Sequence, residues 1–279
     1  MCKHQFDNQM RRVEPLPALS RAIKRHPIIT FFVLTYMITW SFVPFGSFGA
    51  FGPLVAAVIT APLTRGRAGL KELGLRIIRW RVRWYWYAVA IGLPLAIHGL
   101  TVLINQLAGI GIPRQGFTSI GGWLLIFGVR LINPLDGPLG EEPGWRGFAL
   151  PGLQATRSPL VSTAILAVLI TVWHLPLFFL EGGSLPLSTI VGGVVGPFAF
   201  TFVATWLFNH TGGSVLMTII LHAAEGSIRA EGWAYTVLWT IVAIGLVIFD
   251  WKSWRSPAPP AATTPQPDQP QELSPGTAA

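Results

Sequence analysis

Residues 159–180 read PLVSTAILAVLITVWHLPLFFL and contain no Asp, Glu, Lys or Arg. An apolar run of about 18 or more residues is long enough to cross the hydrocarbon core of a bilayer as one helix. The whole chain has this character, since it is 51% hydrophobic and 11% charged, with a mean hydropathy of +0.53. A soluble domain carries about 25% charged residues. The sequence therefore predicts an integral membrane protein.

The same criterion marks eight candidate transmembrane segments, which predicts an all-α bundle of about eight helices. They cover residues 27–45, 47–64, 84–110, 117–139, 159–180, 186–208, 213–228 and 232–249. The fourth segment is broken by the residues Asn133, Pro134, Asp136, Gly137 and Pro138, and the seventh is short. A broken span persists at membrane depth only where neighbouring helices or water satisfy the freed backbone groups.

Basic residues predict the orientation of the bundle. They cluster before the first segment and again in residues 65–83, after the second. By the positive-inside rule both clusters are cytoplasmic. An even number of spans, eight, then predicts that both termini are also cytoplasmic. We expect the host bilayer to be the plasma membrane. We therefore expect a basic N-terminal segment (1–26), a membrane domain (27–250) and a disordered Pro/Ala-rich tail (251–279).

The net charge of +8 follows from this topology and is not taken as a sign of nucleic-acid binding. Basic residues alternate with apolar ones in residues 65–83, which is typical of a helix lying on anionic lipid, so the expected partner is the bilayer. The chain has one cysteine, Cys2. An internal disulfide and a zinc site built from several cysteines are both excluded.

A charged group, EEPGWR at residues 141–146, interrupts the apolar sequence. Charged residues in hydrocarbon persist mainly in a bundle interior or beside a water-filled cavity. Because proline is tolerated in a first helical turn, we expect a helix from near Glu142 to about Gln154, with both carboxylates at its N-terminus. Glu142 and Arg146 have the spacing of an ion pair on one helix face. Glu141 points about 100° away from its neighbour and is left free to act on water.

Two histidines, His174 and His222, lie in later apolar segments, and their distances from the segment ends predict a similar depth. An imidazole can exchange a proton, polarise a water or ligate a metal, and a carboxylate with two imidazoles suits hydrolysis. We therefore predict Glu141, His174 and His222 as catalytic residues. They could also hold a divalent ion such as zinc with an open fourth position, although the chain lacks a His-Glu-x-x-His motif. Arg130 and Asp136 either pair with each other or line the cavity.

Each of these features alone also has a structural explanation. An intramembrane histidine can serve a hydrogen bond between helices, and Glu142 with Arg146 can be a structural pair. It is their occurrence together that favours a site.

At these residues the sequence resembles the CAAX protease and bacteriocin-processing (CPBP) family of intramembrane endopeptidases, also called the Abi family. The first motif of that family, two glutamates followed after three residues by an arginine, matches Glu141, Glu142 and Arg146. The histidines of its second and third motifs match His174 and His222. The matches extend from Glu141 to the neighbours of His222, and the first half of the chain adds only topology.

The resemblance implies an eight-helix bundle with an intramembrane cavity that opens toward the cytoplasm and the lipid. It also implies that Glu141 activates a water together with His174. His222 would stabilise the tetrahedral oxyanion, and Glu142 with Arg146 would support the site.

Two positions depart from the family pattern. Ile170 stands where the second motif has an aromatic residue. In prenyl-protein endopeptidases of the family, an asparagine four residues after the last histidine helps to hold the oxyanion, whereas this chain has Gly226, preceded by Glu225. Glycine has no side-chain donor. Either Glu225, another side chain or a backbone group takes this role, or the protein has altered or lost proteolysis.

Three functions follow from these observations. The leading hypothesis is an endopeptidase, metal-dependent or not, that cleaves a membrane-associated or lipidated peptide or protein as in CAAX processing. The second is a catalytically silent membrane protein that binds another protein, as in bacteriocin immunity, and is motivated by Gly226. The third is a proton-coupled transporter, because intramembrane Glu and His also form proton relays. Transporters often have duplicated halves, and none is evident here.

Overall fold

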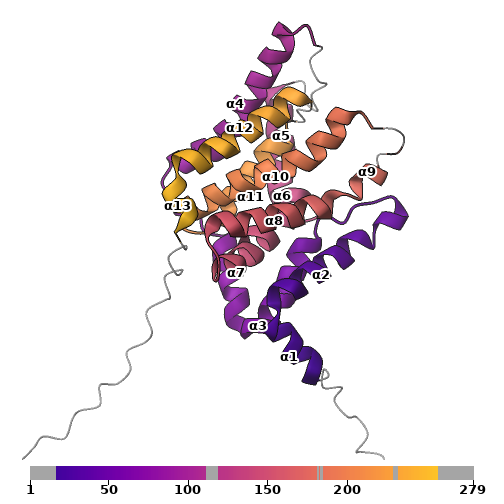
Figure 1. Cartoon of the computed structure of the whole chain (residues 1–279), viewed down its shortest axis with the longest axis vertical. Helices are drawn as coiled ribbons and strands as arrows, with labels where there is room; N and C mark the ends of the chain where they lie inside the picture. Colours follow the sequence, from indigo (N-terminus) through magenta and orange to yellow (C-terminus); the bar gives the residue numbers. More distant parts are fainter. Residues whose placement is uncertain (1–16, 111–118, 181, 183–184, 229–231, 257–279) are drawn as a thin grey trace, which may run out of the picture.

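The structure is a computed structural model that describes residues 17–110, 119–180, 182, 185–228 and 232–256. Throughout these residues the regular structure is helical, without a strand (Figure 1). The predicted all-α class is confirmed. Residues 1–16, in the basic N-terminal segment, and 257–279, in the predicted tail, lie outside the described part of the chain.

The first half of the chain forms the elements that precede the charged group. In order they are α1 (Pro17–Arg25), α2 (Pro27–Trp40), the 3-10 turn η1 (Val43–Phe45), α3 (Gly52–Ile77) and α4 (Tyr85–Leu107). A kink divides α3 at Gly66, where φ is +60° and ψ is −151°. Glycine adopts such a conformation without the steric cost of a side chain. The kink separates the apolar first half of α3 from its basic second half. The basic half belongs to the basic segment 65–83.

The second half forms the elements that build the site. They are α5 (Ile120–Ile132), α6 (Gly137–Gly144), the π-helix η2 (Trp145–Ala149), α7 (Leu150–Gln154), α8 (Pro159–His174), α9 (Leu177–Leu180), α10 (Leu187–His210), α11 (Val215–Gly226), α12 (Trp233–Phe249) and α13 (Trp251–Arg255). Helix α10 lies between α8 and α12 (Figure 1). Helix α11 packs against α4, α5 and α6.

Each of the eight predicted spans overlaps at least one of these helices. By length and composition, four helical segments of the described chain can each cross a membrane: Pro27–Phe45, Tyr85–Leu107, Pro159–Leu180 and Leu187–His210. Val215–Gly226 and Trp233–Phe249 are shorter apolar helices. The protein is a membrane protein, and its fourth predicted span is broken, as expected, between α5 and α6.

The helix that carries Glu141 begins earlier than predicted. Asp136 caps it, because its Oδ1 accepts a hydrogen bond of 2.7 Å from the Gly137 N–H, and Pro138 lies in its first turn. The expected start near Glu142 is therefore wrong, and both glutamates lie in the second turn. Here the capping side chain one turn upstream decides the boundary. The predicted end at Gln154 is confirmed by α7.

Large buried aromatic side chains pack the neighbouring helices against this one. The ring of Trp145 is fully buried and lies edge-to-face against Phe31 of α2, with centroids 5.7 Å apart, and against Trp173 of α8 at 5.4 Å. Near the C-terminus, Trp254 of α13 is 2% exposed and donates its indole N–H to the Leu246 carbonyl. Ordered helix therefore extends into the first residues of the segment 251–279 that we predicted to be disordered.

Candidate active site

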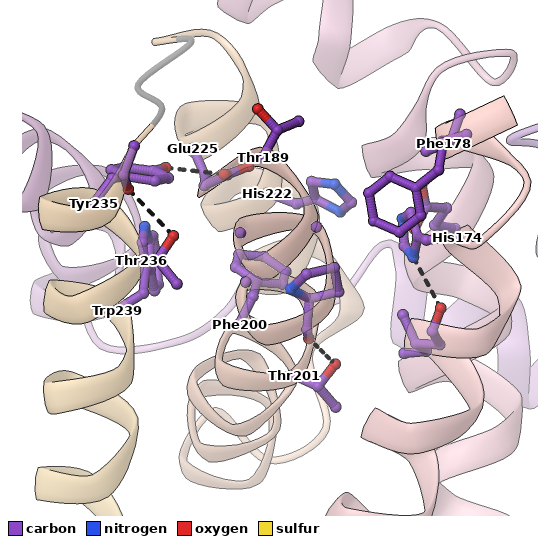
Figure 2. A pocket seen from close by; sticks show the side chains of 18 of the residues that line it. His174, Phe178, Thr189, Phe200, Thr201, His222, Glu225, Tyr235, Thr236 and Trp239 are labelled. Carbon is purple, nitrogen blue, oxygen red and sulfur yellow. Dashed lines mark hydrogen bonds between the residues drawn. The ribbon is translucent and has the colours of Figure 1, made fainter. Parts of the chain in front are cut away.

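A cavity of about 520 Å³ lies among helices α6, α8, α9, α10, α11 and α12. Glu141 of α6, His174 of α8 and His222 of α11 all line it, although these residues are far apart in the sequence. Arg146 and Glu225 also line the cavity. Figure 2 shows His222 between the pair Glu225 and Tyr235 on one side and His174 on the other. The structure thus brings together the three side chains that were predicted to act as one site.

Glu142, Arg146 and His222 form a compact buried cluster. Glu142 is fully buried and Arg146 is 1% exposed. The Glu142 Oε1 atom accepts a hydrogen bond of 2.9 Å from Arg146 Nη1 and lies 2.9 Å from His222 Nδ1. Because a carboxylate oxygen accepts hydrogen bonds, this contact places a hydrogen on His222 Nδ1. The predicted pair of Glu142 and Arg146 is present, and it also orients His222.

Glu141 has a partner that the sequence analysis missed. Its Oε2 accepts a hydrogen bond of 3.2 Å from the indole N–H of Trp145, so this side chain is held in place rather than left free. The pair has the same spacing of four residues as Glu142 and Arg146. That spacing was the available signal. Glu141 is 6% exposed and lines the cavity.

Gly137 keeps the space between Glu141 and His222 open. A Cβ atom at this position would stand 2.9 Å from Glu141 Oε1 and 3.1 Å from His222 Nε2. Both distances are shorter than ordinary contacts of a carbon atom. In the sequence, Gly137 stands out only as one of the residues that break the fourth span. Its position opposite His222 depends on the packing of α6 against α11, which has no local signature.

His174 is held by its own helix. Its Nδ1 atom lies 2.9 Å from the carbonyl oxygen of Ile170. Because a carbonyl only accepts, Nδ1 carries the hydrogen, and the neutral ring then has its lone pair on Nε2. The ring also contacts Trp173 edge-to-face, with centroids 4.7 Å apart. Ile170, which replaces the aromatic residue of the family motif, still serves the site through its backbone.

The far end of the cavity is aromatic and contains a second carboxylate. Glu225 Oε1 accepts a hydrogen bond of 2.9 Å from the Tyr235 hydroxyl. Aromatic side chains and small residues of α9, α10 and α12 form the rest of this wall, among them Phe178, Phe200, Trp239, Gly192 and Gly193. These residues were missed because each looks like an ordinary membrane-helix residue in the sequence.

Arg130 and Asp136 form an ion pair, with 3.1 Å between Arg130 Nη1 and Asp136 Oδ2. This is one of the two arrangements that the sequence left open. Neither residue lines the cavity. The guanidinium of Arg130 instead lies against Gly226, the residue at the position of the expected asparagine.

The π-helix η2 is held by Arg76 of α3. This buried side chain donates a hydrogen bond of 2.8 Å to the Gly147 carbonyl and pairs with Glu72. Burial lowers the pKa of Arg76 from its ordinary value, and the Glu72 carboxylate opposes this change. A π-helical turn is frequent at functional sites, and here it carries Arg146.

The predicted metal ligands do not form a metal-binding group. Across the described residues, no three or more His, Cys, Asp or Glu side chains are arranged to hold a metal ion. The Nδ1 atoms of His174 and His222 already contact Ile170 and Glu142. These contacts use Nδ1 of each ring, and we derive no step through a metal ion.

A comparison with protein families places this site in a known group. Residues 122–227 match the family model of type II CAAX prenyl endopeptidases that are Rce1-like. This match supports membership of the CPBP family. The resemblance drawn from the sequence is confirmed. The CPBP match runs from α5 through α11 and contains Glu141, His174, His222 and Gly226. No curated protein matches the chain.

Proposed function

We propose that this protein is an intramembrane endopeptidase that hydrolyses a peptide bond in a membrane-associated or lipidated protein, as in CAAX processing. One observation carries the proposal: Glu141, His174 and His222, from three separate helices, line a single cavity. Membership of the CPBP family supports it, because the matched model describes prenyl endopeptidases.

Glu141 and His174 activate a water in this proposal. His174, with its Nδ1 hydrogen on the Ile170 carbonyl, accepts one hydrogen bond of the water at Nε2. Glu141 removes a proton as the water oxygen bonds to the carbonyl carbon, and the carbonyl electron pair moves to its oxygen. The proton then passes to the amide nitrogen while the C–N bond breaks, which releases an amine and a carboxylic acid. Atoms and charge balance with one water consumed.

His222 faces the developing oxyanion. The Glu142 carboxylate orients its ring through Nδ1 and stabilises positive charge on it, so that a hydrogen on Nε2 can be donated to the oxyanion. Arg146 balances the charge of Glu142 in the buried cluster. Gly137 leaves room for the water and the oxyanion between Glu141 and His222.

The proposal includes an orientation. The basic residues within 65–83 support a cytoplasmic position for this segment and for both termini, with the plasma membrane as the host bilayer. The divalent ion that the sequence left open is tested by chelation below.

The decisive experiment compares wild type with Glu141→Gln, His174→Ala and His222→Ala in lipid nanodiscs. Matched prenylated and unprenylated peptides serve as substrates, with and without a chelator, and new peptide termini are identified by mass spectrometry. We expect kcat to fall by about 10²–10⁴-fold in each variant. The control is His98→Ala, a histidine of α4 that does not line the cavity, which we expect to retain activity.

Cleavage that survives Glu141→Gln unchanged would contradict the proposed mechanism. Folded wild type that binds a peptide without cleaving it would instead favour the silent binding protein. Substrate-driven proton flux in sealed vesicles, without cleavage, would favour the transporter.

A further inference from the structure

Gly226 lies one turn beyond His222 on α11, and the guanidinium of Arg130 rests directly on it. A Cβ atom at residue 226 would lie 2.6 Å from Cζ and 2.9 Å from Nε of Arg130, and closer still to Nη2. The φ of Gly226 is not positive, and the residue belongs to a regular helix. The Arg130 guanidinium therefore occupies the space that a Cβ atom would need, and the backbone conformation does not itself call for glycine.

The other side of the same guanidinium reaches the start of α6. Arg130 Nη1 pairs with Asp136 Oδ2 at 3.1 Å, while Asp136 Oδ1 caps α6 through the Gly137 N–H. Gly137 in turn lies between Glu141 and His222. A continuous set of contacts thus joins α11 to α5 and α5 to the helix that carries Glu141.

The position of Arg130 depends on these two contacts. Its Nε atom is buried and has no hydrogen-bond partner within the described part of the protein. The ion pair itself is partly exposed, with side chains that are 22% and 27% accessible. A partly exposed pair contributes little to stability. Its main effect is then on geometry.

We propose that Arg130 is a positioning residue for the reaction described above, and that its guanidinium takes the place of a side chain at residue 226. Seated on Gly226 and paired with Asp136, it sets the distance between His222 and Glu141. This inference rests on the proposed function. It explains how a chain with glycine at this position keeps α6 and α11 in register, and it argues against Gly226→Asn as a gain of activity.

The test is a double-mutant cycle of Arg130→Ala and Gly226→Ala. In the wild-type background, Gly226→Ala forces the guanidinium away, and we expect kcat to fall about tenfold with little change in KM. In the Arg130→Ala background, the methyl group that Gly226→Ala introduces has no guanidinium to displace. There it should leave kcat unchanged or raise it, and it should raise the unfolding temperature because alanine is a better helix former than glycine.

Two further variants sharpen the cycle. Gly128→Ala is the matched control, since Gly128 lies on α5 with open space where a Cβ would stand. It should leave kcat unchanged. Arg130→Lys keeps the charge opposite Asp136 but lacks the planar group that covers Gly226. It should lose part of the activity without a matching loss of stability.

An equal effect of Gly226→Ala in both backgrounds, on kcat and on unfolding temperature, would overturn the proposal. Higher activity of Gly226→Asn with Arg130 intact would also overturn it. If folded wild type cleaves no peptide, the proposed function fails. A different effect of Gly226→Ala on the unfolding temperature in the two backgrounds then decides by itself whether Arg130 and Gly226 are coupled.

Discussion

At the α6 end of the cavity the side chains are tied to one another by buried polar contacts, whereas at the α12 end the walls are mainly aromatic rings and glycines, with one polar pair, Glu225 and Tyr235. Glu142 contacts both Arg146 and His222, but Phe178 and Gly193 meet only through van der Waals contact. Polar contacts have directions and fixed distances, and apolar packing tolerates changes of shape. We therefore expect the first end to set the chemistry of the proposed reaction and the second end to set which substrate fits.

The largest expected effect comes from breaking the polar end at Glu142. Glu142→Gln leaves Arg146, which is 1% exposed, without a charged partner. Removing one member of a buried ion pair costs about 3–5 kcal/mol, so we expect a large drop in unfolding temperature and loss of cleavage. Arg65→Gln breaks a pair whose arginine is 51% exposed, and should cost at most about 1 kcal/mol. Equal losses in the two variants would refute the special role of the buried pair.

A smaller effect is expected from filling the space between Glu141 and His222. Gly137→Ala places a methyl group against both side chains, and overpacking of this kind costs about 1–3 kcal/mol. We expect kcat to fall by about ten- to a hundredfold, measured as initial rates at saturating peptide. Gly74→Ala, at a site with open space on α3, is the control. A kcat that stays at the wild-type value would show that this space is not used by the reaction.

The smallest effect is expected at the aromatic end. Phe178 lines the cavity, whereas the next residue, Phe179, is 82% exposed and does not. Phe178→Ala should raise KM about tenfold for peptides with a bulky apolar group and leave kcat nearly unchanged. Phe179→Ala should change neither. A fall in kcat with constant KM in Phe178→Ala would assign this end to the chemistry instead.

The sequence predicted features that depend on residues close to one another along the chain. The apolar runs gave the helical class, and Asn133 with Pro134 marked the break before α6. The i, i+4 spacing predicted the pair of Glu142 and Arg146, because both residues lie on one helix. The similar depth of His174 and His222 stays a prediction, although both residues line the cavity.

The contacts between helices could not be predicted in this way. The position of Gly137 opposite His222 depends on how α6 packs against α11, and the seat of Arg130 on Gly226 depends on the approach of α5. Pro143 predicts a start of α6 that is too late, because the capping side chain of Asp136 decides where this helix begins. Phe178 and its neighbours at the aromatic end resemble any lipid-facing residues until the fold brings them to one cavity.

The hydrogen bond from Arg76 to the Gly147 carbonyl has a practical consequence for measuring activity. It joins the basic half of α3, which suits an anionic lipid surface, to the π-helix that carries Arg146. We therefore expect the rate of peptide cleavage to depend on the fraction of anionic lipid in the bilayer that surrounds the protein. Assays of the proposed activity then need a bilayer with a defined fraction of anionic lipid.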